Sequence, residues 1–170
     1  MRLTGQEWWA LIHGVVLGGL YLLAFAGGLA ELYGLRPHLV TAQGLRARIR
    51  RLKIGTATMA TVTWLTDITG TWIVYPWYRD PAPGSPRSRL LASESTAGWH
   101  EFAMEWKEHI AWISPILATA VVFIVFSLDA DLVHHERARR TAMTLFVLAF
   151  VFAAVAGLLG ALITKAAPVA

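Results

Sequence analysis

Long apolar runs separated by shorter polar stretches dominate the pattern of residues along the chain. Four of these runs cover roughly residues 8–30, 54–75, 110–128 and 142–164. At 1.5 Å per residue, each run is about long enough for one helix to cross a hydrocarbon core of ~30 Å. The pattern therefore predicts an all-α fold, a four-transmembrane-helix bundle that forms a single domain over residues 1–170.

Basic residues beside the runs predict the orientation of the bundle. The first connection contains six of them with no acidic residue, and three more stand near the start of the fourth run. They are Arg36, Arg46, Arg48, Arg50, Arg51 and Lys53, and then Arg137, Arg139 and Arg140. Because positive charge marks the cytoplasmic side of a membrane protein, we expect an N-out/C-out arrangement. Both termini and the connection between helices two and three then lie on the outer, periplasmic face.

The first two connections carry structural signals of their own. Residues 43–53 alternate basic side chains with Leu45, Ile49 and Leu52, which share one helical face. This pattern predicts a short amphipathic cytoplasmic helix before helix two, which we interpret as a solvated anchor rather than a specific lipid site. Residues 76–98 contain four prolines, so they predict a long outer loop or lid without regular helix.

Composition narrows the class of protein. Hydrophobic residues make up 56% of the chain and the mean hydropathy is +0.51, which excludes an ordinary soluble domain. The net charge of +4 comes from residues beside the apolar runs, so we expect membrane lipid and no nucleic acid as a partner. Since the chain contains no cysteine, disulfides, iron–sulfur clusters and covalent c-type haem are excluded. The expected localisation is the cell inner (plasma) membrane, with multiple passes.

Three ionisable residues inside or at the edge of the runs are the main functional candidates: His13, Asp67 and His109. In the predicted topology His13 and His109 lie at similar depth near the outer face. Two neutral imidazoles from different helices are the arrangement that a bis-histidine haem b requires. Asp67 is expected to point into the bundle, as a partner of an imidazole, a proton relay, a quinol head-group ligand or a bond that fixes packing.

The residues around these candidates allow more than one interpretation. Gly14 and Gly18 form a Gly-x-x-x-Gly pair, which indicates close helix packing or clearance for a flat cofactor. Glu105 and Glu108 fit either a solvated acidic helix start or an orienting or metal-binding role. Trp112 shares their helical face, and Arg79 in the outer connection could neutralise haem propionates.

The strings HGVVLGG at residues 13–19 and EWKEHIAW at residues 105–112, within this architecture, resemble bacterial four-helix integral-membrane b-type cytochromes. The resemblance implies a membrane-embedded electron-transfer subunit of a larger respiratory or photosynthetic redox complex, with one haem b held by His13 and His109. It also implies other membrane or periplasmic redox subunits as partners and, as a second ligand, quinone. No second histidine pair lies in the inner halves of the runs, so a two-haem relay is not expected.

Two other classes of function stay open at this point. One is a non-haem metal or quinone site, in a copper-handling protein or a membrane oxidoreductase, with Asp67, Glu105 or Glu108 as alternative ligands beside His13 and His109. The other is a structural or assembly subunit without a cofactor. No nucleophile, phosphate loop or hydrolytic triad stands out, so we expect an accessory subunit of an oxidoreductase without catalytic residues of its own.

Overall fold

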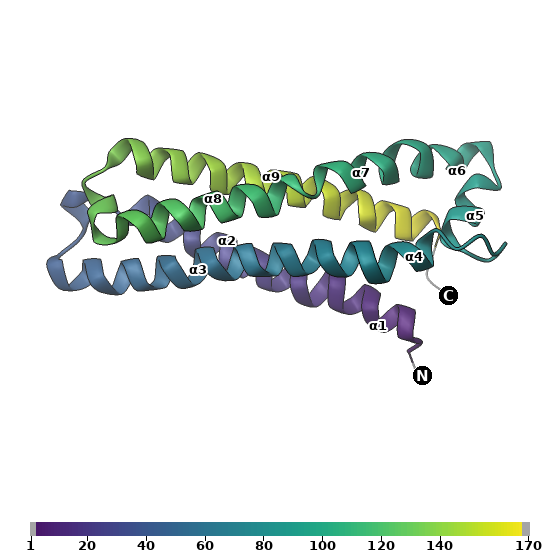
Figure 1. Ribbon diagram of the computed structural model, residues 1–170, viewed down its shortest axis with the longest axis horizontal. Helices are drawn as coiled ribbons and strands as arrows, with labels where there is room; N and C mark the ends of the chain where they lie inside the picture. The colour runs from purple at the N-terminus through teal and green to yellow at the C-terminus, as the bar shows by residue number, and fades with distance from the viewer. Residues whose placement is uncertain (1–2, 168–170) are drawn as a thin grey trace.

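The computed structural model describes residues 3–167, which form helices joined by short connections and contain no strand. Four long helical segments lie side by side (Figure 1), and we number them in chain order. They are Gly5–Gly34, 42–78, Glu94–Val133 and Glu136–Ala166. The all-α prediction is confirmed.

The two ends of the bundle differ in what they contain. Both chain termini lie at one end together with residues 79–98, and we call this the terminal end (Figure 1). Two tight connections, near residues 35–41 and 129–135, close the opposite end, which we call the hairpin end. Each segment contacts the next in sequence, and the fourth returns to the first, so the first and third segments lie diagonally across the bundle.

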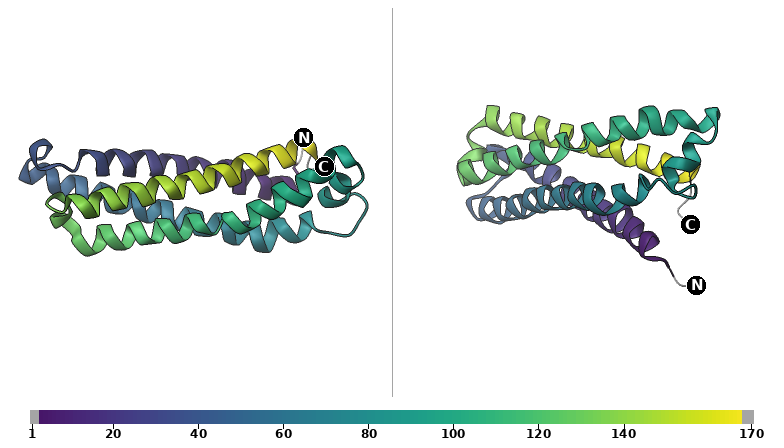
Figure 2. Two further views of the ribbon diagram at one scale, coloured as in Figure 1. Left: turned by 90° about the horizontal axis from the view of Figure 1, so that it is seen from above. Right: turned by 45° about the vertical axis from the view of Figure 1, so that its right-hand side comes forward.

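The first segment consists of α1 (Gly5–Leu11), a π-helical turn η1 (Ile12–Val16) and α2 (Leu17–Gly34). Thr4 starts it with a capping box, in which the Thr4 hydroxyl accepts from the Glu7 backbone and the Glu7 carboxylate accepts from the Thr4 backbone. Toward the terminal end, α1 diverges from the other segments (Figure 2).

The second segment consists of α3 (Ala42–Thr69), the π-helical turn η3 (Gly70–Val74) and α4 (Tyr75–Tyr78). The prediction of a separate short helix at residues 43–53 is wrong. This amphipathic stretch forms the first three turns of α3. It continues without a break because Ile49 and Leu52 are buried against the bundle core, which fixes the helix direction.

Three of the four predicted spans are helices long and apolar enough to cross a membrane: the first, third and fourth segments. The second segment is not among them, because threonines and Asp67 interrupt its apolar residues. Its threonine hydroxyls donate to carbonyls one turn back, as from Thr56 to Leu52 at 2.9 Å and from Thr66 to Val62 at 2.8 Å. These hydrogen bonds satisfy the hydroxyls within the helix itself.

The third segment is built from several short pieces. After α5 (Pro86–Leu91), it contains α6 (Glu94–Gly98), the π-helical η4 (Trp99–Met104), α7 (Glu105–Ile110), α8 (Ile113–Leu128) and the 3₁₀ turn η5 (Asp129–Val133). The break between α7 and α8 lies one turn before Pro115. Because proline has no backbone N–H, Pro115 cannot donate a helical hydrogen bond to the carbonyl of Ala111.

Residues 76–98 differ from the predicted loop, because two short helices form within them. Pro86 stands at the first turn of α5, where its missing N–H costs nothing, and the Ser85 hydroxyl caps that turn by accepting from the Ser88 backbone. The prolines therefore limit helix length here without preventing helix formation.

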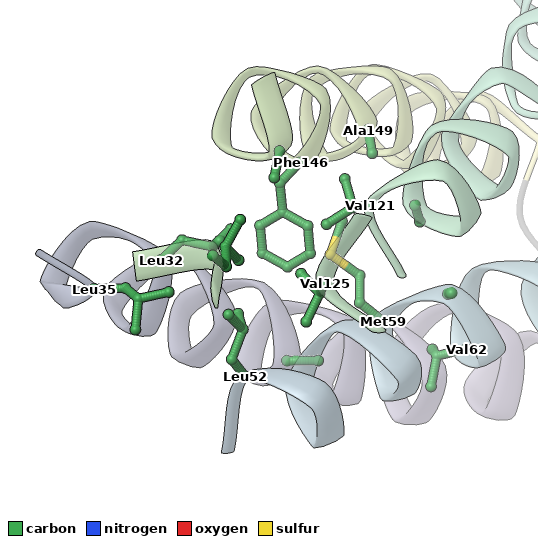
Figure 3. Packing of buried hydrophobic residues seen from close by; sticks show 14 of the residues in the cluster. Leu32, Leu35, Leu52, Met59, Val62, Val121, Val125, Phe146 and Ala149 are labelled. Atoms are coloured by element: carbon green, nitrogen blue, oxygen red, sulfur yellow. The ribbon is translucent and has the colours of Figure 1, made fainter. Parts of the chain in front are cut away.

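The fourth segment is a single helix, α9 (Glu136–Ala166), and it supplies the centre of the core. Phe146 is fully buried and packs between residues of the other segments, among them Met59, Val121 and Val125 (Figure 3). This core occupies the half of the bundle toward the hairpin end. A smaller cluster around Tyr78, Leu90 and Ile163 holds the terminal end together.

Candidate functional site

Three ionisable side chains from three different segments lie near one another in the half of the bundle toward the terminal end. They are His13 of η1, Asp67 of α3 and Lys107 of α7, and we call them the polar cluster. Lys107 interacts electrostatically with both of the others. Polar groups at this depth of an apolar bundle require partners, so the contacts of each side chain decide what the cluster can do.

His13 lies against the second segment. Its Nδ1 is 3.2 Å from Thr69 Oγ1, and a Cβ built on Gly70 would lie only 3.0 Å from its Cε1. The absence of a side chain at Gly70 thus provides the space that the imidazole occupies. The π-helical turns η1 and η3, which widen the backbone locally, occur where these two segments meet.

The hydrogen bonds of Thr69 fix the tautomer of a neutral His13. Thr69 Oγ1 donates its only hydrogen to the Leu65 carbonyl at 2.7 Å, so it can only accept from the imidazole. His13 Nδ1 therefore carries the hydrogen, and Nε2 presents a lone pair. His13 Nε2 can therefore accept a hydrogen bond from a donor group on a ligand.

Asp67 is half-buried, and its Oδ2 is shielded from solvent without a hydrogen-bond partner in residues 3–167. No cation lies within 4.0 Å of its carboxylate in that part of the chain, although Lys107 influences it electrostatically. An unpartnered carboxylate oxygen at this depth is a ready acceptor for a proton or for a donor on a ligand.

From the sequence, Lys107 is, like Arg79, only a basic residue of the outer connection that could neutralise haem propionates, because it stands in a stretch of glutamates that fits a solvated helix start. Its side chain lies on the fourth segment, where a Cβ built on Gly160 would be 3.3 Å from Lys107 Cε. Helical spacing could have indicated that Lys107 is buried. Ala103, Ile110 and Ser114 lie four, three and seven residues from it on the same helical face, and all three are buried.

A second set of polar residues surrounds Arg79 at the terminal end. Arg79 pairs with Glu105, lies 3.6 Å from Glu108 Oε2 and covers the Tyr75 ring at 4.9 Å from its centroid. Arg79, the predicted partner of haem propionates, is thus already paired with Glu105 and Glu108, the two carboxylates predicted as alternative metal ligands.

His100, buried beneath α5, connects this region to the smaller hydrophobic cluster. Arg87 Nε donates to His100 Nε2 at 3.2 Å, so His100 Nδ1 carries the hydrogen and donates to Tyr78 Oη at 3.0 Å. Burial raises the pKa of Tyr78 to about 12, so the phenol stays protonated. These contacts fix α5 to the end of the second segment.

The structure does not bring His109 to His13. His109 is exposed, and its Nδ1 lies 2.6 Å from the Glu105 carbonyl of its own helix. Lys107 faces the fourth segment, and His109, two residues later, lies about 200° further around the helix. Trp112 also lies away from His13, because it packs edge-on against Trp64 and Trp72 at centroid distances of 6.1 and 6.4 Å.

The remaining predicted site residues lie in open space. A Cβ built on Gly14 or Gly18 would meet no atom within 4 Å in residues 3–167, so these glycines do not bring another segment of this chain into close contact. Within the same residues, no group of three or more His, Asp or Glu side chains is arranged to hold a metal ion.

These positions decide whether a bis-histidine haem fits. Both imidazoles leave Nε2 free, as an axial ligand must, but one imidazole is packed inside the bundle and the other is exposed on the far side of its helix. A bis-histidine haem requires both rings to face one iron atom, whereas these two imidazoles are held against different parts of the bundle, His13 by Thr69 and His109 by its own helix. The residues of this chain, as they lie here, do not fit the group.

An apolar groove lies at the terminal end, about one helical turn from His13 along the first segment. It has a volume of about 260 Å³ and lies between α1 and the end of the second segment. Its lining residues are Gly5, Gln6, Trp9, Ala10, Ile73, Val74 and Trp77. Ala10 is about one helical turn from His13, and Val74 is about one turn from Gly70, so the groove ends about one turn from His13, which does not itself line it.

Comparisons with known proteins assign no family to this arrangement. No protein-family model matches the sequence, and no curated protein or solved structure shows significant similarity to it.

Proposed function

We propose that this chain is a four-span protein of the cell inner membrane, with both termini outside, that binds the head group of a quinol or quinone beside His13. It would serve as a subunit of a redox complex whose other subunits carry the electrons. The observation that supports this most directly is that an apolar groove reaches Ala10, one helical turn from His13, with Asp67 and Lys107 in the same half of the bundle.

The groove has the size and chemistry for one substituted ring. Its volume of about 260 Å³ is slightly below the range of ~300–1,000 Å³ that is typical of drug-sized ligand pockets, and Trp9 and Trp77 offer flat apolar surfaces. The groove lies at the flank of the bundle, so an isoprenoid tail attached to the ring can remain in lipid. A haem macrocycle is too large for a groove of this volume.

The polar cluster has the groups that quinol chemistry needs. A quinol hydroxyl can donate to the lone pair of His13 Nε2, since Thr69 holds the ring in that tautomer. When a quinol gives up two electrons, its two hydroxyl protons must leave, and imidazole and carboxylate groups are suitable acceptors. Asp67 has an unpartnered oxygen for this purpose, and Lys107 offsets the negative charge of its carboxylate.

Binding of a soluble quinone tests the proposal. We expect decylubiquinone to bind the purified protein in nanodiscs, and His13→Ala to weaken its affinity at least about tenfold through loss of one hydrogen bond to a buried group. His109→Ala is the matched control, because that imidazole is exposed and distant from the groove, and it should bind within about twofold of the wild type.

Three outcomes would contradict the proposal. Equal affinity of the two variants would show that His13 does not contact the ligand. A reduced-minus-oxidised haem spectrum that both substitutions abolish would favour the bis-histidine cytochrome instead. If decylubiquinone binds no form of the protein and no haem is present, the chain is better explained as an assembly subunit.

A further inference from the structure

A second groove lies at the hairpin end, at the opposite end of the bundle from the polar cluster. It has a volume of about 360 Å³ and runs between α3 and the turn η5. The residues that line it are Arg46, Ile49, Arg50, Lys53, Ile54, Asp129 and Ala130. Cationic and apolar side chains therefore share one concave surface.

The basic residues at the start of α3 divide into two groups according to their partners. Arg48 and Arg51 both pair with Glu31 of the first segment, which Arg48 Nη1 approaches to 2.8 Å. Arg46 and Arg50 line the groove, are exposed, and form no ion pair with any residue in 3–167. If these arginines served only to attract the membrane surface by their charge, there would be no reason for two of them to be paired and two to be left unpaired.

Helix geometry directs the two unpaired arginines to the same place. Arg46, Arg50 and Lys53 are spaced four and three residues apart, so their side chains lie one above another on one face of α3. Two guanidinium groups one turn apart offer many N–H donors to a single anion. Arginine is the side chain best suited to bind phosphate oxygens in this way.

The single acidic residue of the groove is already neutralised. Asp129 Oδ1 lies 2.8 Å from Lys53 Nζ. Asp129 adopts a φ of 49°, the only positive φ of a non-glycine residue in 3–167, and it lies at the groove wall beside Lys53. The three cations of the lining outnumber this one carboxylate, so the groove carries net positive charge.

The groove also lies at the boundary between polar and apolar sequence. Arg46, Arg50 and Lys53 precede the apolar part of the second segment, which begins at Ile54, and the Ile54 side chain is 61% exposed. Phosphate groups of a bilayer sit at such a boundary, with the glycerol and acyl chains on its apolar side.

We propose that this groove binds an anionic phospholipid, with Arg46 and Arg50 donating hydrogen bonds to its phosphate and with Ile54 contacting the start of an acyl chain. The occupant is a lipid rather than free phosphate, because an exposed isoleucine extends the site on its apolar side. This goes beyond a general attraction of basic residues to the membrane surface, since it names two arginines and leaves the others out.

Binding of lipid to variants of the full chain tests the proposal. We expect phosphatidylglycerol, added to protein in neutral detergent, to raise the melting temperature, and phosphatidylcholine to raise it much less. The double variant Arg46→Gln/Arg50→Gln should lose most of this selectivity. Because both arginines are exposed and unpaired, the variant should fold, which its melting temperature without lipid will verify.

The control is Arg137→Gln, which removes an exposed arginine at the same end of the molecule but outside the groove. It should respond to phosphatidylglycerol as the wild type does. A third arm replaces lipid with inorganic phosphate alone, which should give no comparable shift.

Several results would overturn the proposal. One is an equal response of the double variant and the wild type to phosphatidylglycerol, and another is an equal loss in Arg137→Gln, which would indicate general charge alone. A full response to inorganic phosphate would make the site one for free phosphate. The test is independent of quinone binding, because no residue of this groove belongs to the polar cluster.

Discussion

Gly28 determines how closely the first and fourth segments pack. A Cβ built on it would lie 2.7 Å from Phe146 Cζ, and Phe146 is fully buried and packs against Phe25 with centroids 5.4 Å apart. On its other side, Gly28 meets Gly55 of the second segment, whose own Cβ would lie 3.5 Å from the Gly28 backbone. The close packing of the first, second and fourth segments therefore requires a glycine at this position.

We expect Gly28→Ala to destabilise the protein by about 1–3 kcal/mol, since the fully buried ring of Phe146 would have to shift to make room for the methyl group. Gly27→Ala is the matched control. Its methyl group would meet nothing within 4 Å, so it should be neutral or stabilising by about 0.5–1 kcal/mol through helix propensity. Thermal unfolding in detergent measures both, and equal effects of the two substitutions would show that the contact is wrong.

Asp67 and Lys107 provide a second prediction at the residue scale. Removing the lysine by Lys107→Met leaves Asp67 without its nearby cation, so the single substitution should lower stability more than it does in an Asp67→Asn background. We expect a coupling free energy of about 1 kcal/mol in the double-mutant cycle.

The control for this cycle is the exposed pair of Glu136 and Arg140, one turn apart on α9, which should give about 0.3 kcal/mol. If the coupling of the buried pair is no larger than that of the surface pair, the two charges do not form one site.

At the scale of elements, the third segment shows what a sequence can and cannot specify. The apolar run at residues 110–128 predicts a helix, because its length and hydropathy do not depend on how the helix is rotated. The rotation decides which side chains meet, and one residue changes it by about 100°. His109 and Lys107 are two residues apart, and only Lys107 lies toward the fourth segment.

The same reasoning explains the other partial results. His13 and Asp67 stand out in the sequence because they interrupt apolar runs, and that signal is local. The continuity of α3 through residues 43–53 and the short helices α5 and α6 depend on contacts with distant segments, which a local pattern does not contain.

The terminal end is held partly by one hydroxyl, which leads to a prediction about α5. Tyr78→Phe removes the acceptor for His100 Nδ1 and should cost about 1 kcal/mol of local stability. Trypsin should then cleave after Arg87 faster than in the wild type. Tyr33→Phe is the control, since Tyr33 is 56% exposed, and its cleavage rate should not change. Identical rates in the two variants would mean that the bond to His100 does not fix α5.

At the scale of the whole molecule, the path of the second segment determines the topology. If it crosses the membrane with the other three, residues near 95 and the two termini share one side, and residues near 134 lie on the other. If it does not cross, residues 95 and 134 exchange sides relative to the N-terminus.

Cysteine labelling distinguishes these arrangements without background, because the chain has no cysteine of its own. We expect a membrane-impermeant maleimide to label Ser95→Cys in intact cells and to label His134→Cys only after lysis; both positions are exposed. The reverse pattern would contradict the four-span arrangement with both termini outside.

The central claim is that a quinone ring binds in the groove beside His13, and photolabelling tests its location most directly. A photoreactive quinone analogue, irradiated with the protein in nanodiscs, should attach within residues 5–10 and 73–77, and excess decylubiquinone should suppress the label. Label that is spread evenly over the lipid-facing helices, or that excess decylubiquinone leaves unchanged, would contradict the claim.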